Sequence, residues 1–379
     1  MAKKAILTID GVHRKVKKEF ITIDNTYHNT YHKIKKAYIT IAGVYRPCWA
    51  GGGELSYYGK ITDLSVARTR LAATSVGGYA LFGGGIDTDY LNVVDAYNES
   101  LTRSKPSGLY VNRADLAATS VGSYALFAGG SATVNGSFSK SKHVDAYNES
   151  LTRSVPTDLY AARNDFAATT VGDYALFGGG AVVDAYNKSL TRSNPTGFST
   201  SVNYLTATAV GDYALFGGGG TDTNAIFSTV FAYDKSLTQT LPTGLSVARA
   251  KLAATTVGDY ALFGGGSIGT IGGSNSSTVD AYNKSLTRTL PTELSVARSL
   301  LSAATVRDYA LFGGGYATSS PFYSAVVDAY DTYLTRTIPA ALNTARSVFA
   351  ATSVGNFALF GGGNSSTAKC ATVDAYTVI

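Results

Sequence analysis

Arginine and aspartate recur in this chain at fixed positions of a repeated unit, and they are the side chains best able to do chemistry. An arginine precedes a run of small residues in six copies of the unit, at Arg68, Arg113, Arg163, Arg249, Arg298 and Arg346. An aspartate follows later in the same copies, at Asp95, Asp145, Asp184, Asp280, Asp328 and Asp374. A second arginine follows in five copies, at Arg103, Arg153, Arg192, Arg288 and Arg336. Such a set could bind a ligand, act in catalysis, or hold the fold together.

The fourth copy favours the structural interpretation, because it lacks the whole set. Val202, Phe231 and Gln239 occupy the three positions there. A buried carboxylate is costly unless an arginine satisfies it, whereas replacing the entire group by apolar residues is close to neutral. The joint loss therefore predicts that the three side chains touch one another and belong to the scaffold.

The remaining polar residues do not form a recognisable catalytic or metal-binding set. Four histidines are present, at His13, His28, His32 and His143. Only the last lies in the repeated region, so we expect no zinc or copper site there. The glycine runs do not continue into a phosphate-binding loop, no Ser/His/Asp set is evident, and a lone pair such as Asp87 and Asp89 is more often solvated than bound to calcium. We predict a protein that is not an enzyme, with no catalytic residue, no metal site and no cofactor.

The elements that must position these side chains belong to a sequence repeat of about 45 residues, which occurs seven times from residue 64 onward. The tetrapeptide Tyr-Ala-Leu-Phe begins at Tyr79, Tyr124, Tyr174, Tyr213, Tyr260 and Tyr309, and the seventh copy has Phe357 in place of the tyrosine. A glycine-containing run follows each tetrapeptide, and Val-Asp-Ala-Tyr comes later in six copies. A period of roughly 40 to 50 residues rich in β-formers and glycine is typical of a propeller or a solenoid.

Each copy predicts four strands, which in the first copy are residues 71–76, 79–82, 93–97 and 101–103. The small residues of the first strand suit the crowded centre of a radial array of sheets. Glycine is the first turn residue after that strand in six copies, which predicts a type II′ hairpin. The sixth copy has Arg307-Asp308 instead, which predicts strain or a different turn.

The two ends of the repeated region predict a closed ring. The seventh copy stops after its third strand at Ile379, and residues 55–60 precede the first copy at the distance expected of an orphan fourth strand. Pairing these two segments would remove exposed sheet edges. The predicted fold is all-β, with a seven-bladed propeller over residues 51–379 closed by an N-terminal strand.

Residues 1–50 are predicted to form a separate, basic domain of β-hairpins. Residues 1–49 hold ten Lys and Arg against three Asp and Glu, a net charge of +7, and the rest of the chain has a net charge of −1. Three similar strand–turn–strand runs begin near residues 5, 20 and 38, and Asp10-Gly11 is the clearest hairpin turn. The segment shows neither a reading helix nor a stacked aromatic platform, so a solvated face or an acidic protein partner is favoured over nucleic acid. The predicted docking residues are Arg14, Lys15, Lys17, Lys18, Lys33, Lys35 and Lys36.

Two sets of positions differ between the copies. The loop between the second and third strands ranges from 2 residues in the third copy to 13 in the second, and the two residues after the pre-strand arginine also change. In a four-stranded blade both connections emerge on one face, and variation confined to one face is how a repeat scaffold carries a binding site. Drifting loops without a function are the alternative. The predicted contact residues are Arg70, Tyr90, Asp115, Phe138, Lys142, His143, Asp165, Tyr204, Phe227, Lys251, Tyr316, Phe322 and Tyr323.

The order of motifs resembles a known repeat family. Pro-x-x-Leu, Arg, a small-residue strand, Tyr-Ala-Leu-Phe-Gly-Gly and Val-Asp-Ala-Tyr resemble the Kelch repeat over roughly residues 54–379. The tryptophan usual in the Kelch fourth strand is absent, and Leu101, Arg103 and their equivalents lie in that strand. Basic hairpins followed by such a propeller also resemble structural proteins of phages and prophages of Gram-positive bacteria.

The second resemblance implies a virion protein of the tail, baseplate or capsid, made in the host cytoplasm. Residues 1–50 would bind other virion proteins, and the propeller would bind a glycan or protein on the host surface. A capsid or tail decoration protein without receptor binding is the alternative, and a carbohydrate-active propeller enzyme is a third. No apolar stretch approaches 18 residues and no signal-like segment begins the chain, so neither membrane insertion nor secretion is expected. Whether the protein forms a homo-oligomer is left open.

Overall fold

A computed structural model describes residues 6–9, 12–15, 36–41, 44–50, 53–134 and 137–379. The chain divides into two compact units, residues 1–54 and 55–379. All helical or extended elements of the described residues are β-strands. A helix long and apolar enough to cross a membrane is not found in this part of the chain.

The described residues of the first unit form two antiparallel strand pairs. β1 (Ile6–Ile9) pairs with β2 (Val12–Lys15), and β3 (Lys36–Ile41) pairs with β4 (Val44–Ala50). They correspond to the first and third predicted strand–turn–strand runs, and the run beginning at residue 20 lies outside the described residues. Among the predicted docking residues, Arg14, Lys15 and Lys36 lie on strands, and the following lie outside the described residues: Lys17, Lys18, Lys33 and Lys35.

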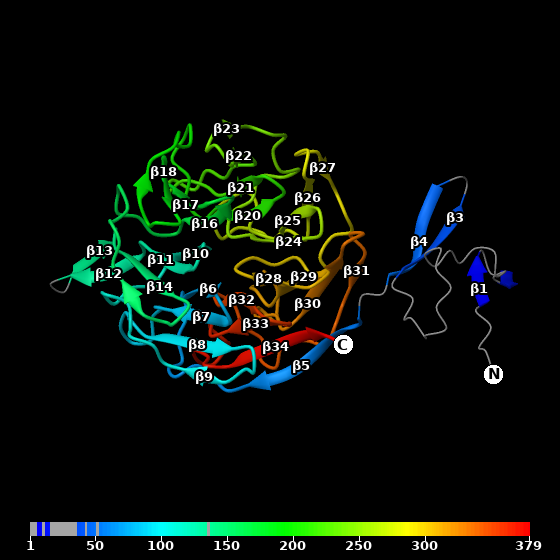
Figure 1. Ribbon diagram of the computed structural model, residues 1–379, viewed down its shortest axis with the longest axis horizontal. Helices are drawn as coiled ribbons and strands as arrows, with labels where there is room; N and C mark the ends of the chain where they lie inside the picture. Colours follow the sequence, from blue (N-terminus) through cyan, green and yellow to red (C-terminus); the bar gives the residue numbers. More distant parts are fainter. Residues whose placement is uncertain (1–5, 10–11, 16–35, 42–43, 51–52, 135–136) are drawn as a thin grey trace. The chain divides into compact units, whose positions relative to one another are not determined.

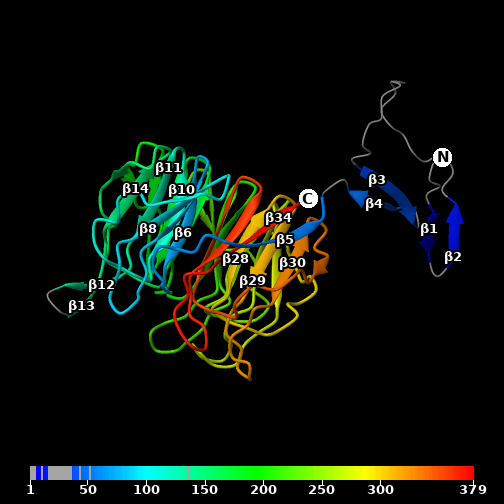
Figure 2. The same cartoon turned by 90° about the horizontal axis from the view of Figure 1, so that it is seen from below.

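The second unit is a ring of seven four-stranded antiparallel sheets, which Figures 1 and 2 show face-on and edge-on. The first strands of neighbouring blades pack side by side around the axis. These first strands are β6 (Ala72–Val76), β10 (Ala117–Val121), β16 (Ala167–Val171), β20 (Thr206–Val210), β24 (Ala253–Val257), β28 (Ser302–Val306) and β32 (Ala350–Val354). The second strands are β7 (Tyr79–Gly83), β11 (Tyr124–Ala128), β17 (Tyr174–Gly179), β21 (Tyr213–Gly217), β25 (Tyr260–Gly264), β29 (Tyr309–Gly313) and β33 (Phe357–Gly361).

The outer half of each blade is less regular. The third strands are β8 (Val94–Asn98), β14 (Val144–Asn148), β18 (Val182–Asn187), β22 (Val230–Asp234), β26 (Val279–Asn283), β30 (Val327–Asp331) and β34 (Val373–Val378). Six fourth strands have two residues each: β9 (Arg103–Ser104), β15 (Arg153–Ser154), β19 (Arg192–Ser193), β23 (Gln239–Thr240), β27 (Arg288–Thr289) and β31 (Arg336–Thr337). The second blade also carries a small hairpin of β12 (Ser131–Val134) and β13 (Ser137–Lys140).

The prediction that Leu101 lies in the fourth strand was wrong. Leu101 has a φ of 59° and its N–H donates to the carbonyl of Asn98 at 2.8 Å, so it belongs to the turn before β9. The side chain of Asn98 accepts hydrogen bonds from the N–H groups of Ser100 and Thr102 at 3.0 and 2.9 Å. An asparagine that bonds its own turn in this way competes with strand pairing, so the strand begins only at Arg103.

The predicted closure of the ring is confirmed. β5 (Leu55–Ile61) is the fourth strand of the seventh blade and pairs antiparallel with β34, with Ile61 opposite Val373 and Leu55 opposite Val378. Figure 1 shows the two strands, blue and red, side by side. The hydroxyl of Tyr57 donates to Asp374 Oδ1 at 2.6 Å across this seam. Main-chain hydrogen bonds therefore join the two ends of the propeller unit.

The hydrophobic core lies between neighbouring blades. Leu81 of the first blade packs in one cluster with Leu116 and Phe127 of the second, and similar clusters recur around the ring. A Cβ on Gly83 would lie 2.7 Å from the ring of Phe127. A side chain on Gly83, the last residue of β7, would therefore collide with the next blade's phenylalanine unless the two blades shift, and only the second blade has a larger residue, Ala128, at this position.

The arginines and aspartates noted in the sequence form a buried network within six of the seven blades. The guanidinium of Arg68 lies 2.9 Å from Asp95 and donates to the carbonyl of Phe82 at 3.0 Å. Arg103 approaches the other carboxylate oxygen at 3.5 Å. Arg68 and Asp95 are both fully buried, so the pairing tethers the connection between blades to the second and third strands. The equivalent pairs are Arg113–Asp145, Arg163–Asp184, Arg249–Asp280, Arg298–Asp328 and Arg346–Asp374.

The fourth blade replaces this network by apolar packing. Phe198 stacks on Phe231 with ring centroids 4.4 Å apart and an interplanar angle of 24°. Val202 is buried in the same cluster. Equivalent positions of the blades are thus occupied either by a complete set of charged residues or, in the fourth blade, by a set without the buried charges.

The turn after the first strand has the φ pattern expected of a type II′ hairpin, with a positive value only at its first residue. Gly77 has a φ of 53°, and Arg307 adopts 48° at the same place in the sixth blade. The sixth copy therefore keeps the turn and accepts a strained residue. The Arg307 side chain donates two hydrogen bonds, at 3.1 and 3.0 Å, to the Asn356 side chain in the neighbouring turn.

Removing one charged side chain of a buried network should lower the free energy of unfolding more than replacing the whole network by apolar residues does. We expect Asp280→Ala to lower the free energy of unfolding by about 3–5 kcal/mol, because Arg249 is left buried without its counter-charge. A combined variant that copies the fourth blade should lose less of its free energy of unfolding. It carries Arg249→Val, Asp280→Phe, Arg288→Gln and Leu245→Phe. Urea denaturation of both variants measures this. An Asp280→Ala variant as stable as the wild type would contradict the structural role of the network.

The strained turn predicts a stabilising substitution. Arg307→Gly should raise the free energy of unfolding by about 1 kcal/mol, because glycine adopts positive φ without steric cost. Gly77→Ala is the matched control and should lower it, since its Cβ would be strained and would meet the Glu149 side chain at 3.1 Å. Thermal melts of both variants measure the effect, and a destabilised Arg307→Gly protein would show that the Asn356 contact outweighs the strain.

Candidate functional site

Seven residues with left-handed backbone conformation encircle one mouth of the central channel. Their φ values lie between 53° and 58°, and none of them is glycine. Each N–H donates to the carbonyl of the equivalent residue in the preceding blade, at 2.7 to 3.3 Å, so the hydrogen bonds run head to tail around a closed circle. These ring residues are Arg70, Asp115, Asp165, Tyr204, Lys251, Leu300 and Val348.

The ring residues surround a cavity of about 390 Å3. Its floor is apolar and consists of the residues that follow them: Leu71, Leu116, Phe166, Leu205, Leu252, Leu301 and Phe349. The rim has two parts, an arc of five polar side chains from Arg70 to Lys251 and an arc of two apolar ones, Leu300 and Val348. The sequence-predicted residues Arg70, Asp115, Asp165, Tyr204 and Lys251 are therefore brought together at one site.

The charges on the polar arc are unevenly paired. Arg70 lies 3.4 Å from Asp115 Oδ2. Asp165 accepts a hydrogen bond from the Asn164 side chain at 2.8 Å, and burial together with the nearby Asp115 raises the pKa of Asp165 to about 6. Burial lowers the pKa of Lys251, whose Nζ lies 5.2 Å from the centre of the Tyr204 ring. The cavity at the channel mouth is thus lined by hydrogen-bond donors, hydrogen-bond acceptors and an aromatic ring.

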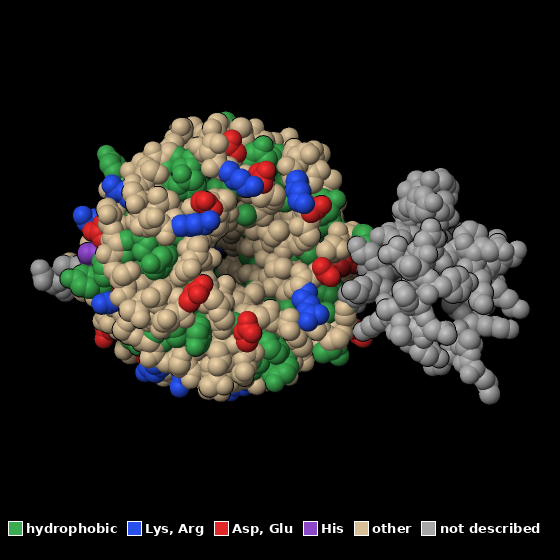
Figure 3. Space-filling view, viewed as in Figure 1, with side chains coloured by type: hydrophobic (Ala, Val, Ile, Leu, Met, Phe, Trp, Pro, Cys, Tyr) green, Lys and Arg blue, Asp and Glu red, His purple; other side chains and the backbone are tan. Residues whose placement is uncertain are grey.

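The opposite end of the inner strands is lined by small and hydroxyl side chains, which enclose about 440 Å3. Hydroxyls of neighbouring inner strands bond to one another, as in Thr119 and Thr170 at 2.9 Å and Thr208 and Thr256 at 2.8 Å. Figure 3 shows one face of the ring, hollowed at its centre, with Lys, Arg, Asp and Glu side chains set around the hollow.

The variable loops emerge on the same face as the ring residues. In six blades a short bridge joins the base of the loop to the residue before a ring residue, such as Thr69 to Ile86 and Ser299 to Tyr316. In the sixth blade the Tyr316 and Phe322 rings stack at 5.8 Å, and the Tyr323 ring meets Tyr316 edge-on at 5.4 Å. Phe322 remains exposed, so these three residues form an aromatic cluster above the blade.

The other predicted contact residues are placed less uniformly. Phe138 is exposed on β13, and Tyr90 is half-buried in a bridge with Ile86. Phe227 packs against the core of the third and fourth blades, so part of its ring is buried and is not accessible to a ligand. Asp87, considered for calcium, lies 3.7 Å from Lys369 Nζ. Within the described ranges, no group of three or more His, Cys, Asp or Glu is arranged to hold a metal ion.

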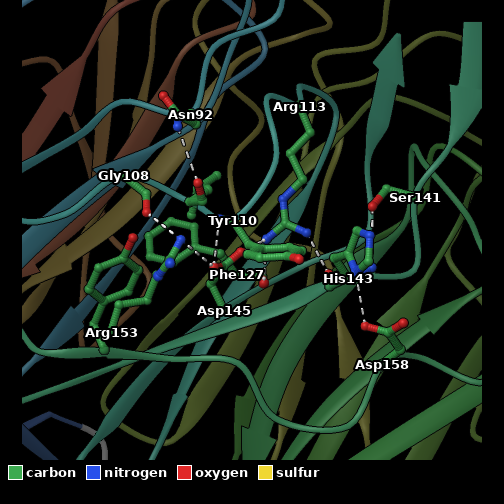
Figure 4. A network of polar contacts seen from close by, with 12 residues as sticks. Asn92, Gly108, Tyr110, Arg113, Phe127, Ser141, His143, Asp145, Arg153 and Asp158 are labelled. Atoms are coloured by element: carbon green, nitrogen blue, oxygen red, sulfur yellow. Dashed lines mark hydrogen bonds and ion pairs between the residues drawn. The ribbon is translucent and has the colours of Figure 1, made fainter. Parts of the chain in front are cut away.

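Lys142 and His143 both contact Asp158 at the second blade, and Figure 4 shows His143 and its polar neighbours from close by. His143 Nδ1 is 3.1 Å from Asp158 Oδ1, and Lys142 Nζ is 3.6 Å from Asp158 Oδ2. The ring of His143 also meets the ring of Tyr110 edge-on at 5.5 Å.

Sequence reasoning missed Tyr110 and its equivalent in the third blade, Tyr160. Both are among the most exposed aromatic residues of the described chain. The signal was present, because the residue after the leucine of Pro-x-x-Leu is tyrosine only in the second and third copies.

The comparisons with known proteins bear on the fold. Neither a scan against protein-family models nor a search of curated sequences gave a match. Among solved structures, one titled "Structure of YjhT" matches with a TM-score of 0.54 and 11% identity, covering 83% of this chain and 95% of that one. The chain is a seven-bladed β-propeller that resembles YjhT. The Kelch-like architecture expected from the repeats is in keeping with this likeness, and the resemblance to phage proteins stays a prediction.

The raised pKa of Asp165 predicts a pH dependence of stability. Because its carboxyl binds a proton more tightly in the folded than in the unfolded chain, its stabilising effect is complete below about pH 4 and is lost as the pH rises through about 6. Asp165→Asn should abolish this change. Melting temperatures of both proteins from pH 4 to 7 measure it, and parallel curves would contradict it. Asp115→Asn is the control and should move the change to lower pH, since it removes the neighbouring negative charge.

Proposed function

We propose that the protein acts by binding, and that its propeller recognises a glycan or protein on a host-cell surface through the face that carries the ring residues and the variable loops. One observation supports this most strongly. The seven ring residues share one backbone conformation and one hydrogen-bond pattern, yet they carry side chains of six different types.

The strain at the ring positions supports the same proposal. A non-glycine residue at positive φ costs about 1 kcal/mol, which glycine would relieve. All seven positions nevertheless carry a side chain, and the backbone bonds of the ring need none of them. Side chains held in strained backbone around a cavity are typical of recognition sites.

Contacts within the mouth orient its polar groups before any ligand arrives. The pairs Arg70–Asp115 and Asn164–Asp165 restrict three charged side chains. The aromatic cluster of Tyr316, Phe322 and Tyr323 is likewise fixed by stacking and by a hydrogen bond from Asn364 to the Tyr323 hydroxyl at 3.1 Å. Pre-organised side chains lose less entropy on binding.

We further propose that the protein belongs to a virus particle and that residues 1–50 dock it there. The support is compositional, since the net charge of +7 is confined to residues 1–49. A basic surface of this kind suits an acidic face of another virion protein.

A decoration or assembly protein is the second candidate, and one observation favours it. Leu241, Leu290 and Ile338 occupy the same position after the fourth strands of three consecutive blades, and they are 62%, 58% and 57% exposed. A row of exposed aliphatic side chains on the outer wall suits a contact between subunits.

Adhesion to whole Gram-positive cells tests the proposed function with the full-length protein. We expect the triple variant Tyr316→Ala, Phe322→Ala and Tyr323→Ala, and separately Arg70→Ala, to weaken adhesion roughly tenfold or more, as for hot-spot residues. Glu99→Ala with Glu149→Ala, in exposed turns of the opposite face, is the control and should leave adhesion unchanged. If all variants adhere like the wild type while Leu241→Ser and Leu290→Ser impair particle assembly, the decoration role replaces the proposed one.

A further inference from the structure

One position of the repeat carries an aromatic side chain that the fold does not require. It follows the leucine of Pro-x-x-Leu, and in five copies it is a small polar residue: Ser65, Ser199, Ser246, Ser295 and Asn343. In the second and third blades, which are neighbours, it is Tyr110 and Tyr160.

The main chain performs the structural role that the six blades with a strand-three aspartate share at this position, and the hydroxyls of Ser65 and Ser246 add a second hydrogen bond to that aspartate at 3.2 Å. In the six blades that have the strand-three aspartate, its N–H donates to that carboxylate whether the residue is serine, asparagine or tyrosine, as in Ser246 to Asp280 at 2.8 Å and Tyr110 to Asp145 at 2.8 Å. The tyrosine side chains point elsewhere, and Tyr110 and Tyr160 are 58% and 68% exposed. Their large apolar rings are therefore unexplained by packing.

Each tyrosine ring lies against an arginine that is itself held in place. The guanidinium carbon of Arg153 lies 5.8 Å from the centre of the Tyr110 ring, and Arg153 donates to the carbonyl of Gly108 at 2.8 Å. Arg192 lies 5.8 Å from the Tyr160 ring in the same way. The cation covers one side of each ring and orients it, which leaves the remaining surface for a ligand.

A line of contacts runs from Tyr110 toward the segment that carries Tyr160. Figure 4 shows Tyr110 between Arg153 and His143, and His143 in turn contacts Asp158, two residues before Tyr160. The exposed surface between the rings is consequently polar, and Lys142 stands beside it.

The charge along this line is positive. Asp145 faces both Arg113 and Arg153, so that network holds two positive charges against one negative charge. The equivalent aspartate of the third blade also faces two arginines, and Asp158 is matched by Lys142. Arg153 and Arg192 remain partly accessible, with about a quarter of each side chain exposed, so a negatively charged ligand can reach them.

We propose that Tyr110 and Tyr160 form a second binding surface, on the edge of the second and third blades, for a glycan chain that carries carboxylate or phosphate groups. This rests on the proposed function and extends it. Sugar rings pack their C–H faces on the two tyrosine rings, since the partly positive C–H groups are attracted to the negative face of the aromatic ring. The acidic groups lie over Lys142, Arg153 and Arg192.

The repeat itself supplies well-matched variants. Tyr110→Ser and Tyr160→Ser install the residue that other blades carry at this position, so both proteins should keep the melting temperature of the wild type. Tyr333→Ser is the control, because Tyr333 is 51% exposed in a turn where other copies carry serine, as at Ser100. It makes the same chemical change on a different part of the propeller.

The test is binding of the full-length proteins to an array of neutral, carboxylate-bearing and phosphate-bearing oligosaccharides. We expect the wild type and Tyr333→Ser to bind acidic members, more weakly at high salt, and each tyrosine variant at this surface to bind roughly tenfold less. Comparison of the two acidic classes identifies which anion is recognised.

Three results would overturn the proposal: no binding to acidic glycans by the wild type, preference for neutral ones, or unchanged binding by the Tyr110→Ser and Tyr160→Ser proteins. The cell-adhesion variants separate this failure from that of the proposed function. Adhesion that depends on Arg70 and the Tyr316 cluster, but not on Tyr110 or Tyr160, would retain the proposed function and reject the second surface.

Discussion

The buried pairing of the pre-strand arginine with the strand-three aspartate is the interaction on which the propeller depends. Arg68 bonds Asp95 and the carbonyl of Phe82 in its own blade, while its backbone carbonyl accepts the N–H of Gly363 from the preceding blade at 2.8 Å. One residue thus joins the interblade connection to two strands and to a neighbouring sheet. Because a buried charge is stable only with its partner, the network is either complete or replaced as a whole, as in the fourth blade.

Fixing the arginine also fixes the backbone that follows it. Two residues later the chain reaches the ring at the channel mouth, where the head-to-tail hydrogen bonds satisfy the main chain without help from any side chain. The same separation holds at Tyr110 and Tyr160, where the N–H serves the fold and the side chain is left exposed. A scaffold built this way lets individual positions vary at little cost to stability, so recognition can be altered one blade at a time.

The two surfaces differ in chemistry. The mouth combines an apolar floor with donors and acceptors of both signs, and burial together with the nearby Asp115 raises the pKa of Asp165 to about 6. The edge of the second and third blades has exposed aromatic rings over fixed arginines and an excess of positive charge. Short-range packing and hydrogen bonding dominate at the first, and electrostatic attraction of an acidic ligand is stronger at the second.

The sequence by itself determined the blade number, the closure by a strand at residues 55–60, the scaffold role of the arginines and aspartates, and five residues of the mouth. Each of these follows from comparing copies, because equivalent positions in a repeat have equivalent surroundings. Tertiary structure alone decided the position and exposure of those side chains whose surroundings cannot be deduced by comparing copies of the repeat. It turned Leu101 out of its strand through the Asn98 turn and drew Phe227 toward the core. It also left Tyr110 and Tyr160 exposed over arginines that are far from them in the sequence, Arg153 and Arg192. Such contacts depend on neighbours from other blades or strands, which a periodic pattern does not specify.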